Sequence, residues 1–255
     1  MVTGASSGIG EATARALAVA GYPVVLAARR VARCEEIAKE IRSTGHEAKA
    51  LALDLADPDS ISLFGDLSQE AFGDVEILVS NAGRSGPGTV FELRPDDFAA
   101  TVAVNLVGAQ HLAHLLVGAM VERRRGDAVF VTSETVREPR PGAAGYVASK
   151  WGLEGLARAL QMELEGTGVR ATIIRPGQTL TEMGSDWDQE TTTDVLNSWI
   201  HWGLARHHAF LRPEGVAEAV VSAVSVPRGT HMAIIDVQPE APVRESAGRA
   251  QKGGT

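Results

Sequence analysis

Cysteine and basic residues are scarce in this sequence of 255 residues. Its one cysteine, Cys34, excludes an internal disulfide and any metal site built from several cysteines. Its 24 basic residues are outnumbered by 32 acidic ones, and the net charge of −8 argues against nucleic acid as the main partner. No uninterrupted apolar run approaches the length of about 20 residues that a membrane-spanning helix needs, so we expect no membrane span.

The beginning of the chain bears on where the protein works. Nothing resembling a signal peptide precedes the first apolar run, which favours a reducing, cytoplasmic location. The first predicted strand has only three residues before a glycine-rich turn. Either that strand is short, or a misplaced start removes its beginning.

Short apolar runs alternate with helical patterns along the chain, which predicts parallel strands joined by helices. The expected strands are residues 1–3, 24–28, 48–53, 77–80, 128–132, 170–174 and 231–237. The expected helices end near residue 20, span 31–44 and 104–123, carry Tyr146 to about residue 165, and begin again at Pro213. We therefore predict one α/β domain over residues 1–238, with a doubly wound, mostly parallel sheet flanked by helices. The tail 239–255, rich in proline, glycine and charge, is predicted to be disordered.

A glycine-rich turn follows the first predicted strand, with the sequence Thr3-Gly4-Ala5-Ser6-Ser7-Gly8-Ile9-Gly10. Glycines between a strand and a helix let the backbone approach a pyrophosphate, which rests on the helix N-terminus. The spacing G-x-x-x-G-x-G differs from the commoner dinucleotide pattern G-x-G-x-x-G. The pattern favours a nucleotide site, and the alternative is a tight turn with a structural role only.

Tyr146 and Lys150 are four residues apart in a predicted helix, so their side chains lie on one face. A fixed ammonium beside a phenol favours the phenolate, and we expect Lys150 to lower the pKa of Tyr146 from its usual value of about 10. Tyr146 would then act as an acid or base at ordinary pH. The spacing is also typical of surface helices in which both side chains are merely solvated.

These motifs stand in the order found in the short-chain dehydrogenase/reductase family, which the chain resembles from residue 1 to about Val237. The resemblance implies a Rossmann fold and an enzyme that moves hydride between a nicotinamide cofactor and a CH–OH group. The implied catalytic tetrad is Asn105, Ser133, Tyr146 and Lys150. The implied cofactor-binding residues are Gly4, Ser6, Ser7, Gly8, Ile9, Gly10, Asp54, Leu55, Asn81, Ala82, Gly83, Tyr146, Lys150, Pro176, Gly177, Thr179 and Thr181.

The resemblance also implies a role for each catalytic residue. Tyr146 exchanges a proton with the substrate oxygen, and Ser133 donates a hydrogen bond to that oxygen. Lys150 also binds the nicotinamide ribose, and Asn105 positions a water that relays protons to Lys150. Asn105 is alternatively the N-cap of the helix that follows it, and both roles are compatible. Asp54 is alternatively the cap of a helix that begins near residue 57.

The end of the second strand indicates which cofactor is bound. Enzymes that bind NAD carry an acid there for the ribose 2′-hydroxyl, but this chain has Ala28 followed by Arg29 and Arg30. Arg29 can pair with a 2′-phosphate through charge-assisted hydrogen bonds. We therefore expect NADP(H) rather than NAD(H), and the alternative is that both arginines are solvated at a helix start.

The alternation of strands and helices stops in residues 184–211, where similar enzymes build a substrate lid. Three of the four tryptophans, Trp187, Trp199 and Trp202, lie in this insertion. Apolar residues at helical spacing predict an amphipathic helix over 194–205 whose apolar face covers the site. We expect a bulky, mostly apolar alcohol or ketone, cyclic compounds included. The alternative is that these rings pack on the core or on a neighbouring subunit.

The sequence does not identify contacts for several charged residues near these motifs. Glu134 directly follows the catalytic serine, where similar enzymes often have small residues, and it faces either substrate or solvent. The arginines of the loop 137–142 either recognise an anionic substrate or are solvated, and solvation is the simpler explanation. His111 and His114 are three apart in a predicted helix, but no third ligand is near, so packing or an oligomer contact is favoured over a metal.

We predict an NADP-dependent oxidoreductase that interconverts an alcohol and a ketone or aldehyde without a metal. One rival is a non-catalytic NADP-binding regulator, which cofactor oxidation by the purified protein would exclude. Another is an epimerase or dehydratase on the same scaffold, which product analysis would reveal. By resemblance, we also expect a homodimer or homotetramer formed through the two long central helices.

Overall fold

Seven strands form one sheet in the computed structural model, which describes residues 1–182, 189–205, 207 and 209–243. The strand order is β3-β2-β1-β4-β5-β6-β7, and every neighbouring pair is parallel. The strands are β1 Val2–Thr3, β2 Val24–Ala28, β3 Ala48–Ala52, β4 Ile77–Ser80, β5 Gly126–Val131, β6 Val169–Pro176 and β7 Ile234–Val237. The strand order reverses at β1, as in doubly wound sheets. The predicted fold class is confirmed.

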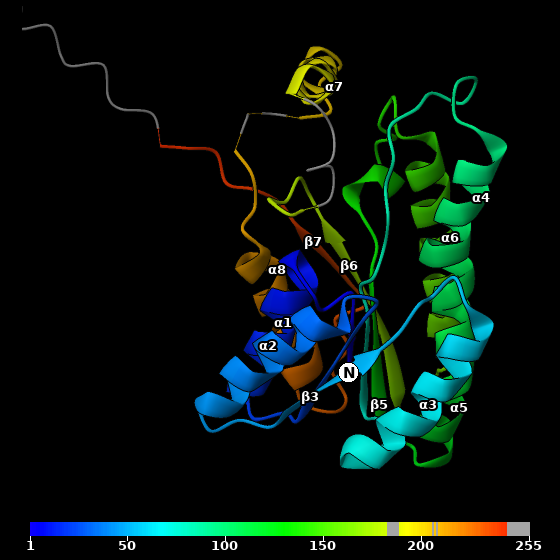
Figure 1. Ribbon diagram of the computed structural model, residues 1–255, viewed down its shortest axis with the longest axis vertical. Coiled ribbons are helices and arrows are strands. Elements are labelled where there is room, and N and C mark those ends of the chain that lie inside the picture. Colours follow the sequence, from blue (N-terminus) through cyan, green and yellow to red (C-terminus); the bar gives the residue numbers. More distant parts are fainter. Residues whose placement is uncertain (183–188, 206, 208, 244–255) are drawn as a thin grey trace, which may run out of the picture.

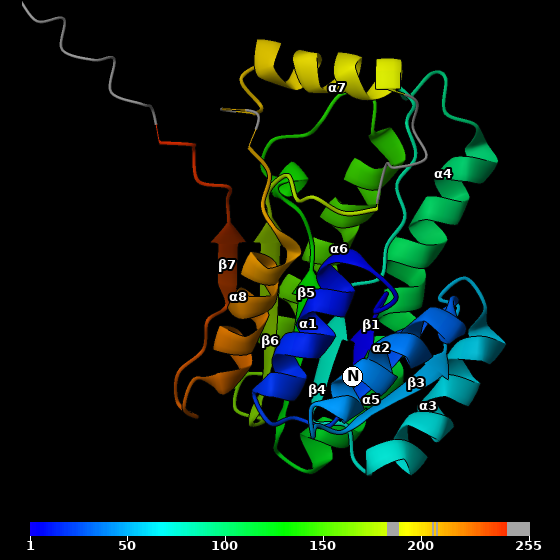
Figure 2. The same ribbon diagram turned by 60° about the vertical axis from the view of Figure 1, so that its left-hand side comes forward.

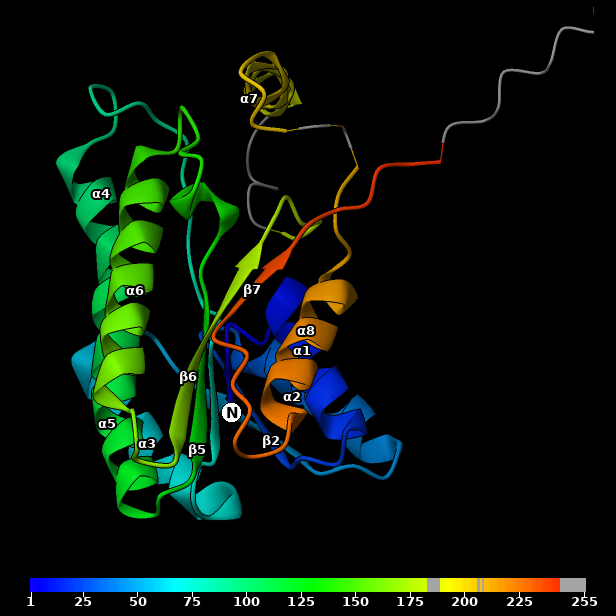
Figure 3. The ribbon, with the colours of Figure 1, turned by 180° about the vertical axis from the view of Figure 1, so that it is seen from behind.

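Helices cover both faces of the sheet (Figure 1), and the view from behind separates the two layers (Figure 3). One layer consists of α1 Gly8–Val19, α2 Val31–Ser43 and α8 Pro213–Ser225. The other consists of α3 Pro58–Phe72, α4 Pro95–Val102, α5 Gly108–Glu122 and α6 Ala144–Glu163. Each layer has its own buried apolar cluster, with Leu17 and Ile37 in the first and Phe64 and Leu112 in the second. The two clusters hold the sheet between them.

Helix α3 is capped by Asp57 and not by Asp54, the alternative that the sequence left open. Asp57 is the N-cap, because its Oδ1 accepts from the Asp59 N–H at 3.0 Å and Pro58 occupies the first helical position. Asp54 instead accepts from the Ala56 N–H at 2.9 Å. The alternative role of Asp54 as the cap of this helix is therefore wrong.

The helix predicted over 104–123 begins earlier than expected, at Pro95. Proline in the first turn, followed by Asp96 and Asp97, favours this start because acids near a helix N-terminus are stabilising. Helices α4 and α5 are joined by a π-helical segment, Ala103–Val107. Asn105 lies inside this continuous helix, so its alternative role as an N-cap is wrong.

The combined helix Pro95–Glu122 is 28 residues long and reaches a mean hydropathy of 1.4. By length and composition alone it could cross a membrane, which corrects the expectation that no segment could do so. Its side chains Leu112, Leu116 and Met120 are buried in an apolar cluster against the sheet. The packing of a core helix accounts for this composition.

Helix α7, Gln189–His201, lies apart from both layers and crosses above the carboxyl ends of the strands (Figure 2). The sequence predicts this helix over residues 194–205, so it begins and ends earlier than expected. The two ends of the insertion are joined, because the Leu180 N–H donates to the Leu211 carbonyl at 2.9 Å and the Leu211 N–H donates to the Gln178 carbonyl at 2.8 Å. Trp187 and residues 244–255 of the predicted tail lie outside the described residues.

Candidate active site

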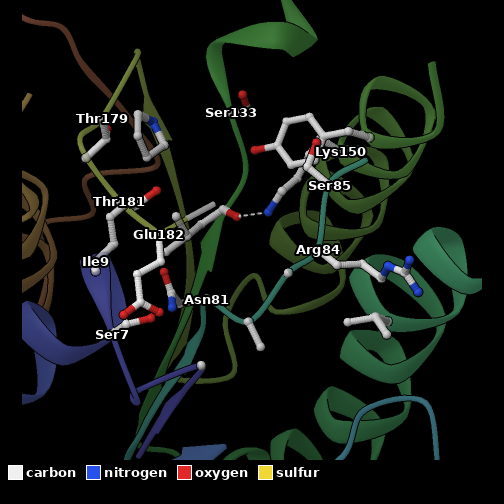
Figure 4. A pocket seen from close by; sticks show the side chains of 18 of the residues that line it. Ser7, Ile9, Asn81, Arg84, Ser85, Ser133, Lys150, Thr179, Thr181 and Glu182 are labelled. Atoms are coloured by element: carbon white, nitrogen blue, oxygen red, sulfur yellow. Dashed lines mark hydrogen bonds between the residues drawn. The ribbon is translucent and has the colours of Figure 1, made fainter. Parts of the chain in front are cut away.

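A cleft of about 880 Å³ runs along the carboxyl ends of the strands (Figure 4). Figure 4 shows Ser7 and Glu182 on one side of this cleft and Ser133 and Lys150 on the other. The predicted site residues that line it are Gly4, Ser6, Ser7, Gly8, Ile9, Arg29, Arg30, Asp54, Leu55, Asn81, Ala82, Gly83, Ser133, Tyr146, Lys150, Pro176, Gly177, Thr179 and Thr181. Gly10 and Asn105 lie behind its wall.

Two glycines shape the turn between β1 and α1. Gly4 has a φ of 66°, and a Cβ there would lie 2.8 Å from the Ala82 Cα. A Cβ on Gly10 would lie 2.2 Å from the Gly4 carbonyl oxygen, so Gly10 packs the turn against the helix rather than lining the cleft. Helix α1 begins at Gly8, and a helix N-terminus favours an anionic group.

The turn Asn81-Ala82-Gly83 is fastened to the glycine-rich turn by Thr3. The Thr3 hydroxyl accepts from the backbone N–H groups of Asn81 and Ala82, both at 3.0 Å. Asn81 Nδ2 donates to the Thr3 carbonyl at 2.9 Å. These bonds fix the spacing of two turns that both line the cleft.

Lys150 is buried on α6, one turn after Tyr146. Its Nζ donates to the Val131 carbonyl at 2.7 Å, the bond drawn in Figure 4, and lies 5.7 Å from the centroid of the Tyr146 ring. Burial lowers the pKa of Lys150 to about 8. Because the low-polarity surroundings disfavour a charged ammonium, Lys150 exchanges protons more readily than a surface lysine.

The pKa of Tyr146 is raised above its ordinary value. Removal of the phenol from water raises it, the hydrogen bond with Ser133 lowers it, and the negative charge of Glu134 raises it. The expected lowering by Lys150 is wrong for this structure, because removal of the phenol from water is the largest influence on its pKa and raises it. Tyr146 is therefore a neutral phenol at ordinary pH.

Asn105 holds the chain that follows Gly83. Its Oδ1 accepts from the Arg84 N–H at 2.8 Å, and its Nδ2 donates to the Arg84 carbonyl and to the Ser149 Oγ, both at 2.9 Å. Its side chain is fully buried. The π-helical segment thus places the Asn105 amide between Arg84, which follows the Asn81-Ala82-Gly83 turn, and Ser149 of α6. Ser149 directly precedes Lys150.

The two arginines after β2 differ in their surroundings. Arg29 is exposed at the cleft, whereas Arg30 lies across the glycine-rich turn. Arg30 donates to the hydroxyls of Ser6 and Ser7 at 3.2 and 2.8 Å, and to Glu182 at 2.7 Å. The hydrogen bond from Arg30 lowers the pKa of Glu182. Sequence reasoning missed Glu182, since no local motif pairs residues that are so far apart in the chain.

Arg140 is buried beside Glu134, the residue that follows Ser133, with 5% of its surface exposed. Its guanidinium pairs with the Glu134 carboxylate, donates to the Leu204 carbonyl, and lies 4.7 Å from the centroid of the Trp199 ring. The expectation of a solvated loop is wrong for Arg140, because these partners replace water. Glu134 therefore faces Arg140 rather than bulk solvent.

The insertion contributes four apolar residues to the cleft: Val195, Leu196, Trp199 and Phe210. Trp202 is 68% exposed and points away from this wall, so the expectation that it covers the site is wrong. It contacts His201 edge to face, with 5.1 Å between the ring centroids. On α7 itself, Trp199 lines the cleft and the neighbouring Ile200 is exposed.

Cys34 and the histidine pair lie away from the cleft. Burial raises the pKa of the Cys34 thiol to about 11, in keeping with a packing role on α2. His111 and His114 belong to α5. In the described part of the chain, no three His, Cys, Asp or Glu side chains are arranged to hold a metal.

Known proteins match this chain over most of its length. A family model described as short chain dehydrogenase matches residues 1–192. The chain belongs to the short-chain dehydrogenase family. The resemblance stated from the motifs is thereby confirmed, as is the expectation of an oxidoreductase family.

Individual relatives differ in how much of their length the chain covers. A protein named as ketoacyl reductase 1 of the granaticin polyketide synthase from Streptomyces violaceoruber is 36% identical, over 72% of this chain and 68% of that protein. A glycine betaine reductase from Emericella nidulans is 32% identical, over 94% of this chain but 18% of that longer protein. Among solved structures, a variant actinorhodin polyketide ketoreductase with NADPH has a TM-score of 0.80 and 31% identity, over 93% of this chain and 94% of that chain.

Proposed function

We propose that this chain is an NADP-dependent oxidoreductase that interconverts an alcohol and a ketone or aldehyde. The observation that carries the proposal is the convergence of Tyr146, Ser133 and Lys150 with the glycine-rich turn in one cleft. When bound, the nicotinamide cofactor supplies or accepts the hydride. The residues of this chain bind and orient the reactants and move the proton.

The cleft fits a dinucleotide that carries a 2′-phosphate. Gly4 has no Cβ where one would meet the neighbouring turn, and the N-terminus of α1 suits a pyrophosphate. Arg29 and Arg30 provide cations at the end of β2, and Ala28 places no carboxylate against a phosphate. A relative that shares this fold was solved with NADPH, which supports the same preference here.

The proton chemistry follows from the surroundings of Tyr146. Its raised pKa keeps the phenol protonated at neutral pH, so Tyr146 donates the proton when a carbonyl is reduced. Ser133 lies beside it and stabilises charge that develops on the substrate oxygen. Lys150 binds the nicotinamide ribose and, with a pKa of about 8, restores the Tyr146 proton. Asn105 positions the water that supplies Lys150.

We infer a bulky substrate, because the insertion places four apolar side chains over one end of the cleft. An apolar wall of this kind accommodates a ring system better than a short acid or a small sugar. The similarity to proteins named as ketoreductases of polyketide synthases supports a ketone rather than an aldehyde.

We also infer that two or four copies of the chain assemble in the cytoplasm. Val107, Leu115, Trp151 and Met162 are exposed apolar side chains on the layer that contains α5 and α6. Exposed apolar surface of this kind favours association. Light scattering of the purified protein at several concentrations measures the assembly, and a monomer at every concentration would contradict it.

The function is tested by NADPH oxidation with ketones graded by size. Tyr146→Phe should lower turnover by about 100-fold or more while NADP affinity stays nearly the same, because only the proton donor is lost. A protein that binds NADP but oxidises NADPH with no ketone in the series would instead be a regulator. Turnover close to the unmutated value in Tyr146→Phe would remove the assigned role of Tyr146.

A further inference from the structure

The short turn that follows Ser133 is fastened to α6 by Trp151. Residues Glu134–Val136 form one turn of 3₁₀ helix, and Ser133 is its N-cap. Trp151 lies on α6, and its Nε1 donates to the Thr135 carbonyl at 3.0 Å. The carbonyls of Ser133 and Glu134 accept instead from backbone N–H groups a few residues later in the chain. The bond to the Thr135 carbonyl therefore comes from outside the turn.

Thr135 connects this bond to the Ser133 hydroxyl. The Thr135 N–H donates to the Ser133 Oγ at 3.2 Å, and the carbonyl of the same residue accepts from Trp151. Because this N–H occupies one lone pair of the serine oxygen, the hydroxyl hydrogen is directed elsewhere, toward the Tyr146 phenol. One residue thus links the Trp151 indole to the hydroxyl that is assigned to the substrate oxygen.

The turn depends on such a tether. A single 3₁₀ turn has poor internal hydrogen-bond geometry, and here the Val136 N–H lies 3.3 Å from the Ser133 carbonyl by its nitrogen. Thr135 and Val136 are buried, each with 6% of its surface exposed. In buried surroundings a carbonyl that loses its donor is destabilising. Loss of the indole N–H should therefore let the turn shift, and the Ser133 hydroxyl with it.

We propose that Trp151 is a positioning residue for Ser133: through the Thr135 backbone, its indole N–H sets where the serine hydroxyl lies relative to the substrate oxygen. Trp151 does not belong to the described residues that line the cleft, so it acts through the turn and not by contact with the reactants. This inference rests on the proposed function and deepens it, because it concerns the alignment of the group that stabilises charge on the reacting oxygen.

Trp151→Phe tests the assignment, because it removes the indole N–H and keeps an aromatic ring. With NADPH and the ketone that the unmutated protein reduces best, kcat should fall by about 3- to 10-fold, since one hydrogen bond of the alignment is lost. The affinity for NADPH should stay the same. Trp202→Phe is the matched control: it makes the same change at an exposed tryptophan outside the cleft lining and should leave kcat unchanged.

The double variant with Ser133→Ala separates positioning from a general effect on the fold. In a chain that already carries Ser133→Ala, Trp151→Phe should change kcat by less than about twofold, because substitutions that act through one group are not additive. A further loss of about 3- to 10-fold in that background would overturn the inference, since Trp151 would then act through something other than the Ser133 hydroxyl.

The pH profile of alcohol oxidation gives a second readout. Burial of the phenol raises the pKa of Tyr146, the hydrogen bond with Ser133 lowers it, and the charge of Glu134 raises it. A displaced Ser133 hydroxyl lowers this pKa less, while Glu134 and Lys150 are unchanged in the variant. Oxidation, which needs the phenolate, should therefore reach its plateau at a higher pH in Trp151→Phe. An unshifted plateau would overturn the inference.

Failure of the proposed function has a different signature, namely no ketone reduction by the unmutated protein. Hydrogen exchange followed by mass spectrometry then decides the inference, because it needs no turnover. The peptide that contains residues 134–136 should exchange about 3- to 10-fold faster in Trp151→Phe than in the unmutated protein, and at the unmutated rate in Trp202→Phe. Equal exchange in both variants would show that the indole does not hold the turn, and the inference would fall.

Discussion

The Arg140 guanidinium lies over the Trp199 ring of α7 and pairs with the Glu134 carboxylate next to Ser133. One buried cation therefore joins the residue that follows Ser133 to the helix above the cleft. A buried ion pair adds little stability by itself, but removal of one partner leaves a buried charge and costs several kcal/mol. The identity of residue 140 should thus affect both the proton donor and the substrate end of the cleft.

Arg140→Met and Glu134→Gln should separate these two effects. In Arg140→Met the unpaired Glu134 charge raises the pKa of Tyr146 further, so alcohol oxidation, which needs the phenolate, reaches its plateau at a higher pH. The double variant with Arg140→Met and Glu134→Gln lacks the Glu134 charge, so its pH profile of alcohol oxidation should return toward that of the unmutated protein. KM for a bulky ketone should be raised in Arg140→Met and in the double variant, because both lack the guanidinium that lies over the Trp199 ring. Identical pH profiles in the single and double variants would exclude the electrostatic role of Arg140.

Lys150→Met should stabilise the protein while it abolishes efficient turnover. Burial lowers the pKa of Lys150 from 10.5 to about 8, so the folded state disfavours the charged form that the unfolded chain carries. This penalty is fully present below pH 8 and disappears as the pH rises from about 8 to 10.5. The free energy of unfolding at pH 7 should therefore rise by about 1–3 kcal/mol, less whatever the lost bond to Val131 contributed.

Denaturant unfolding at pH 7 and pH 10 measures this effect. The difference between Lys150→Met and the unmutated protein should shrink at the higher pH, where Lys150 is largely uncharged in the folded protein and most of the penalty is gone. A difference of the same size at both pH values would show that Lys150 is not a buried cation in solution.

Cofactor preference should depend on both arginines after β2 and on Glu182. Arg29→Ala should lower the preference for NADP over NAD by about 10- to 150-fold, since a charged hydrogen bond contributes about 1.5–3 kcal/mol. Glu182→Gln removes the carboxylate that pairs with Arg30, so NADP binding should become tighter while NAD binding changes little. Fluorescence titration of both cofactors measures these affinities. Weaker NADP binding in Glu182→Gln would show that Arg30 needs its acidic partner in place.

The sequence predicts the sheet and the shared helix face of Tyr146 and Lys150 because both depend on local patterns. Alternating apolar runs define the strands, and Tyr146 and Lys150 share a helix face through a spacing of four. The direction of the Lys150 ammonium depends instead on the Val131 carbonyl, which belongs to a strand nineteen positions earlier. Spacing along one helix carries no information about that neighbour or about the burial of the phenol, which raises the Tyr146 pKa, so the expected lowering was wrong.

Arg140 shows the same limit in a loop. A segment rich in proline, glycine and charge is typical of solvated loops, and its other arginine, Arg137, is indeed exposed. Arg140 is buried because Glu134 and Trp199 approach it from two different segments, one of them some sixty positions away. The start of α4 is different, because a local signal for it exists: Pro95 followed by two aspartates is typical of a helix start. The prediction over 104–123 did not use this signal.

Trp199 and Trp202 provide a matched pair for the role of α7 as a substrate lid. Trp199 lies on α7 and Trp202 directly follows its last residue; Trp199 lines the cleft, whereas Trp202 is 68% exposed. Trp199→Ala removes a ring from the substrate end and the surface on which Arg140 rests, so KM for a bulky ketone should rise by about 10-fold or more, with a much smaller change for a small ketone. Trp202→Ala should change neither constant, because its ring contacts only His201 among aromatic neighbours in the described residues. Steady-state kinetics with one large and one small ketone measure both variants. Equal losses for the two ketones in Trp199→Ala would mean that the ring supports the fold of the insertion rather than the substrate, and a large loss in Trp202→Ala would show that the substrate also depends on the residue that follows α7.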